Sequence, residues 1–198
     1  MGPTFGRGAM TNGWIDIKNT DLMLIMGGNP AENHPCGFKW PIEAKLQRNA
    51  KMIVVDPRFT RTAANADLFL QIRAGADIAF LGGLIDYAIQ NDRLAHDYLV
   101  NYTNAAFIVK DGFKLPEDGL YSGFDPSTHA YDKSTWNYEP STGSGSASLP
   151  PNVAYDVTLQ HPRSVFQLLK QQYSRYTPEM VERITGIPRD QFLKAADL

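Results

Sequence analysis

The chain has 198 residues, of which 43% are hydrophobic and 20% charged, a composition that is typical of a folded domain and excludes disorder throughout. Its 19 basic and 21 acidic side chains leave a net charge of -2, so no overall positive field indicates a nucleic-acid partner. No run approaches the roughly 20 apolar residues of a membrane-spanning helix. The one cysteine, Cys36, can neither form an internal disulfide nor hold a metal cluster alone.

Short apolar runs alternate with helical patterns in the first half of the chain. Residues 22–26 (LMLIM) run into glycines and predict a strand covered on both faces. Pro41 predicts the start of a helix, because proline suits the first helical position. Residues 52–55 (MIVV) and 68–70 (LFL) predict a second and a third strand. Asp77 predicts the N-cap of a long helix with apolar residues at helical spacing.

Composition divides the chain into three predicted parts. Residues 1–110 are expected to form a parallel α/β core, with helices on both faces of the sheet in a three-layer, Rossmann-like arrangement. Residues 111–155 are rich in Gly, Pro and Ser and predict a loop insertion, which includes a flexible polar tract at 141–146. Residues 156–198 predict a truncated helical segment. Its expected helices cover residues 165–173, begin again at Pro178 and continue after Pro188.

The carboxyl ends of the predicted strands carry residues suited to a ligand, and parallel sheets bind ligands at that edge. Residues 27–32 follow the first strand, and their glycines let backbone N–H groups approach a phosphate closely. Residues 73–77 follow the third strand and end in Asp77, whose carboxylate can accept hydrogen bonds from a base. Both groups are therefore candidate parts of a nucleotide site.

The residues after the second strand add charge and hydroxyl groups. Asp56 stands where a carboxylate accepts hydrogen bonds from ribose hydroxyls or from a guanine edge. Arg58 and the hydroxyls of Thr60 and Thr62 can bind a diphosphate. Together, the three strand ends predict that residues 1–110 bind a nucleotide or dinucleotide.

Each of these signals also has a plainer interpretation. Glycines after a strand are often turns, Asp56 before a proline can simply end a strand, and Asp77 can serve only as a helix cap. Arg61 and Arg73 are interpreted as surface charges. Cys36 is expected to be a small buried thiol, and the four histidines have no metal-ligand spacing.

Several runs resemble the molybdopterin oxidoreductase superfamily. They are residues 5–12 (FGRGAMTN), 28–35 (GNPAENHP), 55–63 (VDPRFTRTA) and 73–79 (RAGADIA). Within the superfamily the chain is most similar to the large catalytic (alpha) subunit of formate dehydrogenase, over nearly its whole length. The runs 102–105 (YTNA), 131–134 (YDKS) and 158–163 (TLQHPR) belong to that resemblance.

The resemblance implies that the intact subunit oxidises formate to carbon dioxide at a molybdenum or tungsten ion held by two molybdopterin guanine dinucleotides, with electrons leaving through an iron–sulfur cluster. It implies that one dinucleotide is held by residues on all three strand ends. These cofactor-binding residues are Gly27, Gly28, Asn29, Glu32, Val55, Asp56, Pro57, Arg58, Thr60, Gly75 and Asp77. The implied partners are formate, the remaining part of the large subunit and an iron–sulfur small subunit, and the implied location is the periplasm.

Subunits of that family are several times longer than this chain, which lacks the cluster-binding cysteines and the selenocysteine or cysteine that ligates the metal. We therefore expect an internal fragment that begins just after the metal ligand, as would follow from a deliberate cut or from a selenocysteine codon read as a stop. No residue here is predicted to be catalytic or metal-ligating, so the fragment alone is not expected to turn over formate. Two alternatives stay open: a non-catalytic nucleotide-binding α/β domain, and part of another molybdopterin oxidoreductase such as a nitrate or polysulfide reductase.

Overall fold

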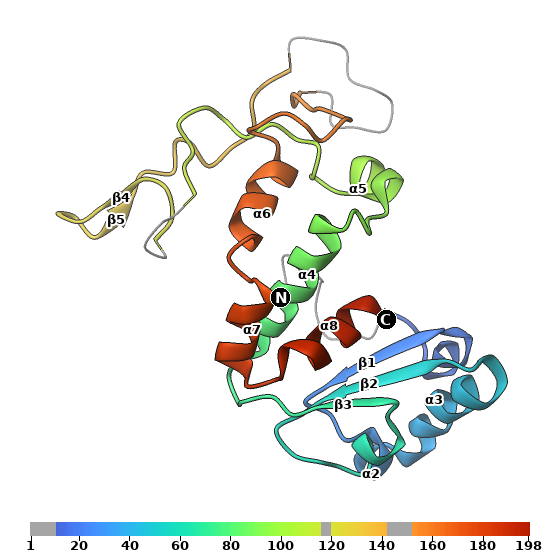
Figure 1. Ribbon diagram of the computed structural model, residues 1–198. Coiled ribbons are helices and arrows are strands. Elements are labelled where there is room, and N and C mark those ends of the chain that lie inside the picture. Colours follow the sequence, from blue (N-terminus) through green and yellow to red (C-terminus); the bar gives the residue numbers. More distant parts are fainter. Residues whose placement is uncertain (1–10, 116–119, 142–151) are drawn as a thin grey trace. The chain divides into compact units, whose positions relative to one another are not determined.

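The computed structural model describes residues 11–115, 120–141 and 152–198 (Figure 1). The chain folds as two compact units, of which one comprises Met1–Leu81 with Pro178–Leu198 and the other Gly82–Thr177. Residues 5–10 of the first family motif and residues 142–146 of the polar tract lie outside the described ranges.

A parallel sheet of three strands forms the centre of the first unit. Strands β1 (Leu22–Met26), β2 (Lys51–Val55) and β3 (Leu68–Leu70) are hydrogen-bonded in that order (Figure 1). The three predicted strands are confirmed, and the bounds of β1 and β3 agree to the residue. The expectation that the first strand is covered on both faces is wrong, because Leu22 and Leu24 share one face of β1 and are 39% and 41% exposed. The apolar run itself still defines the strand. The chain is therefore a mixed α/β protein with a small parallel sheet.

Helix α3 (Pro35–Arg48) covers one face of this sheet. Its side chains Phe38 and Ala44 are buried in one cluster with Met52 and Val54, which point to the same face of β2. Burial of a Phe, Met or Val side chain stabilises a fold by roughly 1.5–3 kcal/mol. Packing against the sheet is therefore what holds this helix.

The predicted start of this helix at Pro41 is wrong, because the helix begins at Pro35 and Pro41 lies buried inside it. Pro35 occupies the first turn, where a missing N–H costs no hydrogen bond, so the helix can begin there. Three short elements of the first unit were not predicted: the 3-10 helices η1 (Trp14–Asn19) and η2 (Ala63–Asn65) and the one-turn helix α2 (Pro30–Asn33). All three are too short to show a helical period in the sequence.

Helices from distant parts of the sequence pack together in the first unit. They are α4 (Asp77–Gln90), which continues into the second unit, α7 (Pro178–Thr185) and α8 (Arg189–Asp197). Ile53 and Val55 of β2 are buried on the face opposite to Met52 and Val54, and α8 contacts β3. Phe80 of α4 and Phe192 of α8 are fully buried and meet edge-to-face, with ring centroids 5.9 Å apart.

The second unit is built largely from loops around a few short elements. These are the end of α4, α5 (His96–Tyr102), the hairpin of β4 (Phe124–Asp125) and β5 (Ala130–Tyr131), and α6 (Val165–Tyr173). Phe166 and Leu159 are buried with Ala105 and Ala106 in its core. The prediction of a helix over residues 165–173 is confirmed.

The units are divided at Leu81 and Pro178, whereas composition placed boundaries at residues 110 and 155. Composition indicates which segments are rich in loops, but it does not indicate which helices pack against the sheet. The last two helices belong to the first unit because Val181 and Phe192 are buried there, a contact that no local pattern reveals.

A tight turn before α6 is held by the carboxylate of Asp156. It accepts hydrogen bonds from the hydroxyl and N–H of Thr158 and from the N–H groups of Gln160 and His161. The bond from the Thr158 hydroxyl is the largest influence, and with the backbone donors it outweighs burial and lowers the pKa of Asp156 to about 2.

This turn should make stability depend on pH. Because an unfolded aspartate has a pKa of about 3.9, the depressed folded-state pKa stabilises the chain above that value and the effect is lost as pH falls towards about 2. We expect Asp156→Asn to lower the urea midpoint at pH 7, and the difference from wild type to shrink below about pH 4. Asp111→Asn, in an exposed turn, is the control. A difference that stays constant from pH 7 to pH 3 would contradict this role.

Candidate nucleotide-binding edge of the sheet

Three loops leave the same edge of the sheet, at the carboxyl ends of its strands. They are loop 1 (residues 27–32, after β1), loop 2 (residues 56–62, after β2) and loop 3 (residues 71–77, after β3). Main-chain bonds continue the strand pairing into the loops: Gly27 N–H donates to Val55 C=O at 3.1 Å, and Asp56 N–H donates to Leu70 C=O at 3.2 Å. The structure therefore brings the three predicted groups of residues to one edge, where parallel sheets bind ligands.

Glycines leave the backbone of two of these loops open. Gly27 and Gly75 have φ values of 61° and 83°, which glycine adopts without steric cost. A Cβ at either position would meet no atom within 4 Å. Within the described ranges, the N–H groups of Gly28 and Gly75 donate to no protein acceptor. Loops 1 and 3 thus expose the type of donor that binds phosphate.

Some polar groups of loop 2 form hydrogen bonds within the loop, and others are available to a ligand. Asp56 Oδ1 accepts the N–H of Arg58 at 2.8 Å, which forms a tight turn. The other carboxylate oxygen of Asp56 and the exposed guanidinium of Arg58 have no partner among the described residues. Thr60 is buried, and its hydroxyl accepts the N–H of Ala63 at 3.1 Å. Thr60 therefore supports the loop from inside.

Loop 2 is tied to loop 3 through a carbonyl. Pro57 C=O accepts a hydrogen bond from Gln71 Nε2 at 3.0 Å. Val55, the last residue of β2, is buried and contributes its C=O to the pairing with loop 1. These two residues shape the edge through their backbone.

Side chains also join loop 1 to loop 2. Thr62 was predicted to face a diphosphate, but it is fully buried and bonds to Asn29, so this interpretation is wrong. The amide of Asn29 donates to Glu32, and Glu32 Oε1 lies 3.1 Å from Arg61 Nε. Arg61 is therefore not merely a surface charge. These contacts link residues about thirty positions apart, and no spacing in the sequence signals them.

Loop 3 ends in an acid that the fold does not use. The C=O of Ala76 accepts the first helical hydrogen bonds, from Ala79 and Phe80, so Asp77 is the first residue inside α4 and not its N-cap as predicted. Its exposed carboxylate has no partner within residues 11–115, 120–141 and 152–198. Asp77 can therefore accept hydrogen bonds from a ligand.

Arg73 anchors loop 3 to α7. Its Nη1 donates to the carbonyls of Arg183 and Ile184, at 2.6 Å and 3.3 Å, and its backbone N–H donates to Thr185 C=O at 2.8 Å. A cation at these last carbonyls is favoured by the helix dipole. The next residue, Gly186, has φ of 77°, and a Cβ there would lie 3.2 Å from the guanidinium. Arg73 is exposed, as expected of a surface charge, but its guanidinium also binds the end of α7.

The unused groups at this edge match the chemistry of a nucleoside diphosphate. Arg58 and the N–H groups of Gly28 and Gly75 suit the phosphates, because a guanidinium and backbone donors bind anions well. The carboxylates of Asp56 and Asp77 suit ribose hydroxyls and the N–H donors of a base.

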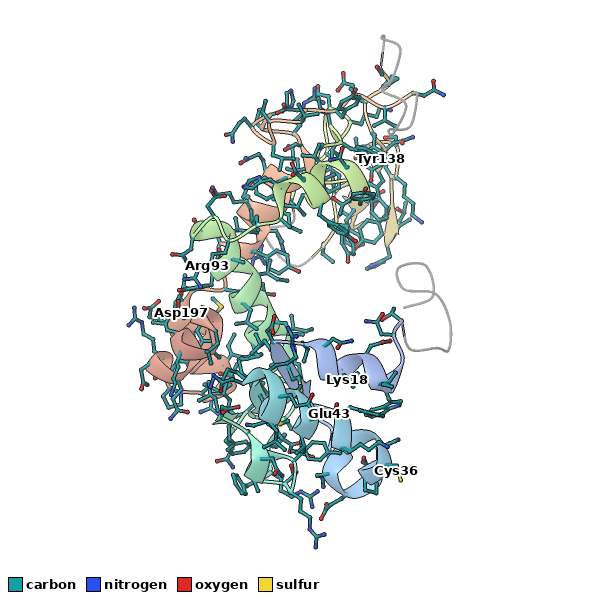
Figure 2. The ribbon with its side chains drawn as sticks, turned by 90° about the vertical axis from the view of Figure 1, so that its right-hand side faces the viewer. Lys18, Cys36, Glu43, Arg93, Tyr138 and Asp197 are labelled. Carbon is teal, nitrogen blue, oxygen red and sulfur yellow. The ribbon has the colours of Figure 1, made fainter. Side chains whose placement is uncertain are left out.

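In the part of the chain that the structure describes, no three His, Cys, Asp or Glu side chains are grouped so that they could hold a metal ion. No helix there combines the length and apolar character needed to cross a bilayer. Cys36 was expected to be buried but is exposed near the start of α3 (Figure 2). The buried residues of α3 are Phe38, Pro41 and Ala44, which are spaced three apart, and Cys36 lies off that stripe, so this expectation is wrong.

The sequence profile described as molybdopterin oxidoreductase matches residues 3–113. The chain belongs to the molybdopterin oxidoreductase family. It is 53% identical to the formate dehydrogenase-O major subunit of Escherichia coli over 199 residues, which are 100% of this chain and 19% of that protein. A nitrate reductase of Shewanella frigidimarina is 34% identical over 103 residues, 52% of this chain and 11% of that protein.

Among solved structures, acetylene hydratase from Pelobacter acetylenicus matches with a TM-score of 0.49 and 19% identity, over 92% of this chain and 20% of that one. The chain spans about a fifth of the length of the curated relatives it matches. Formate dehydrogenases, which are oxidoreductases, are thus its close relatives in the molybdopterin oxidoreductase family.

In this family member, Arg73 should contribute to stability. We expect Arg73→Ala to lower the free energy of unfolding by about 1 kcal/mol, because the last carbonyls of α7 lose a charged donor. Arg73→Lys keeps the charge and should lose less. Urea unfolding followed by circular dichroism measures both, with Lys194→Ala, an exposed substitution on α8, as the control. Equal stability of Arg73→Ala and wild type would restore the interpretation as a surface charge.

Proposed function

We propose that loops 1–3 bind the guanosine diphosphate end of molybdopterin guanine dinucleotide, and that the chain is part of the catalytic subunit of a formate dehydrogenase. The single observation that carries the proposal is the collection of unused donors and acceptors at one sheet edge. It is supported by the 53% identity to a formate dehydrogenase major subunit over the whole chain. The shorter and weaker match to a nitrate reductase makes formate the better-supported substrate.

The proposed site divides into contacts and supports. In it, Arg58 with the N–H groups of Gly28 and Gly75 holds the phosphates, and Asp56 and Asp77 accept hydrogen bonds from the ribose and the guanine. The edge of guanine presents two adjacent N–H donors, which one carboxylate can accept together. The supporting residues shape the loops and complete the proposed set: Gly27, Asn29, Glu32, Val55, Pro57 and Thr60.

In the intact enzyme the bound cofactor, in a bis form with molybdenum or tungsten, would supply the centre that takes two electrons from formate. The residues of this chain bind the nucleotide end and orient it. Charge neutralisation by Arg58 keeps the diphosphate in place, and the two carboxylates fix the rotation of the nucleoside about it. This chain therefore contributes position, while the electrons are proposed to leave through an iron–sulfur cluster carried elsewhere.

We extend the proposal to the fold and the assembly. The sheet is the centre of a three-layer, Rossmann-like domain, which fits α3 on one face and the buried Ile53 and Val55 on the other. We infer that residues 1–110 hold the dinucleotide core and that residues 111–155 and 156–198 are additions to it. The partners are the remaining part of the large subunit and an iron–sulfur small subunit, in the periplasm.

The first test is nucleotide preference. We expect the purified chain to bind GDP at least about tenfold more tightly than ADP, because the edge of adenine opposes an acceptor to a carboxylate. Asp77→Asn should lower the affinity for GDP and leave the affinity for ADP unchanged. Isothermal titration calorimetry measures both. Asp190→Asn is a matched control, since it also removes an acid from the first turn of a helix, α8.

Two results would reject the nucleotide site. One is equal affinity of the folded wild-type chain for GDP and ADP, which would leave only non-specific phosphate binding. The other is an equal effect of Asp77→Asn and Asp190→Asn, which would assign the loss to the helix dipole and not to the base.

The second test concerns catalysis. A hybrid in which this chain replaces the matching 199 residues of the E. coli formate dehydrogenase-O major subunit should reduce a dye in the presence of formate. Arg58→Ala in the hybrid should lower both the retained guanine nucleotide and the activity, by about tenfold. A hybrid that retains the cofactor but has no activity with formate would instead favour a different substrate.

A further inference from the structure

Thr62 is buried between loop 1 and loop 2 and is saturated with hydrogen bonds. Its exposed fraction is 0%. Its hydroxyl donates to Asn29 Oδ1 at 2.9 Å and accepts the N–H of Ala31 at 3.0 Å. Its own N–H donates to the same Asn29 oxygen at 3.2 Å. All three bonds connect loop 2 with loop 1.

The far end of Asn29 carries the connection to the surface. Its Nδ2 donates to Glu32 Oε2, and Glu32 Oε1 pairs with Arg61, the residue before Thr62. The four side chains therefore close a ring across the two loops. The exposed pair of Glu32 and Arg61 contributes little by itself, because water and salt screen it. The buried half, Thr62 with Asn29, is the part that holds the loops in register.

Each loop also has bonds of its own that do not involve Thr62. In loop 2, Asp56 accepts from Arg58 N–H and Thr60 accepts from Ala63 N–H. In loop 1, the one-turn helix α2 keeps its bond from Asn33 N–H to Asn29 C=O. Loss of the Thr62 hydroxyl should therefore uncouple the loops without unfolding either.

We propose that Thr62 is a positioning residue of the nucleotide site, which acts through Asn29 to hold loops 1 and 2 as one preformed surface. The inference rests on the proposed function, but it assigns no ligand contact to Thr62 itself, since the side chain is buried. A preformed surface binds more tightly because the ligand does not have to order the loops. Nucleotide affinity should therefore depend on a hydroxyl that the nucleotide does not touch.

The test compares substitutions of Thr62 in the full chain. Thr62→Val keeps the shape of the side chain and removes the hydroxyl. It should lower the affinity for GDP by about tenfold, which corresponds to about 1.4 kcal/mol. Thr62→Ser restores the hydroxyl and should rescue the affinity to within about threefold. Titration calorimetry gives the affinities, and thermal unfolding reports the stability of each variant.

Ser164→Ala is the matched control. Ser164 is also fully buried, but it lies in the second unit, where its hydroxyl accepts the N–H of Gln167 at 3.2 Å. Its removal should lower the melting temperature to a similar extent and leave the GDP affinity unchanged. A purely structural role of Thr62 would make the two variants behave alike.

The outcomes separate the two proposals. Failure of wild type to bind GDP overturns the proposed function, and the inference with it. Binding by wild type with equal affinity in Thr62→Val overturns the inference alone. Should Thr62→Val not fold, hydrogen exchange in wild type decides: the Ala31 amide must be protected beyond its intrinsic rate, and GDP must increase that protection. An Ala31 amide that exchanges freely, or that GDP does not protect further, overturns the inference.

Discussion

The pairing of three short parallel strands is the constraint on which the rest of the candidate site depends. Parallel pairing sends all carboxyl ends to one edge, and here the ladder extends one residue past the strands, through Gly27 N–H to Val55 C=O and Asp56 N–H to Leu70 C=O. The first residues of loops 1 and 2 are therefore fixed by the backbone of the neighbouring strand. The backbone of Asp56, and with it the origin of its carboxylate side chain, is therefore positioned without any side-chain contact.

Contacts between residues that are distant in the sequence also hold the loops in place, and these contacts differ in how much they contribute to stability. Thr62 is fully buried and its bonds to Asn29 are partly buried, so their loss leaves an unsatisfied polar group at a cost of roughly 1–3 kcal/mol. The exposed pair of Glu32 and Arg61 is screened and contributes at most about 1 kcal/mol. Loop 3 is held in a third way, by the charge of Arg73 at the end of α7.

Local patterns were sufficient for the strands and for most long helices, and insufficient for whatever depends on distant residues. The apolar runs of β1 and β3 are each flanked by a polar residue or a glycine, so their composition alone defines their bounds. The helix start predicted at Pro41 was wrong because proline is typical of the first turn of a helix, and here Pro35 occupies that turn. The burial of Thr62 could not be predicted, since its partner Asn29 lies 33 positions away and is brought near only by the parallel crossover.

Four aspartates illustrate the difference between carboxylates that support the fold and carboxylates that are available to a ligand. Asp125 and Asp156 accept several hydrogen bonds within their own turns, from the hydroxyl of Ser127 and of Thr158 respectively, and these bonds lower the pKa of each carboxyl. Such carboxylates have little capacity left for a ligand. Asp56 has one oxygen free and Asp77 has both, within the part of the chain that the structure describes. Asp56 and Asp77 therefore keep acceptor oxygens at the end of a parallel sheet, where a nucleotide can reach them.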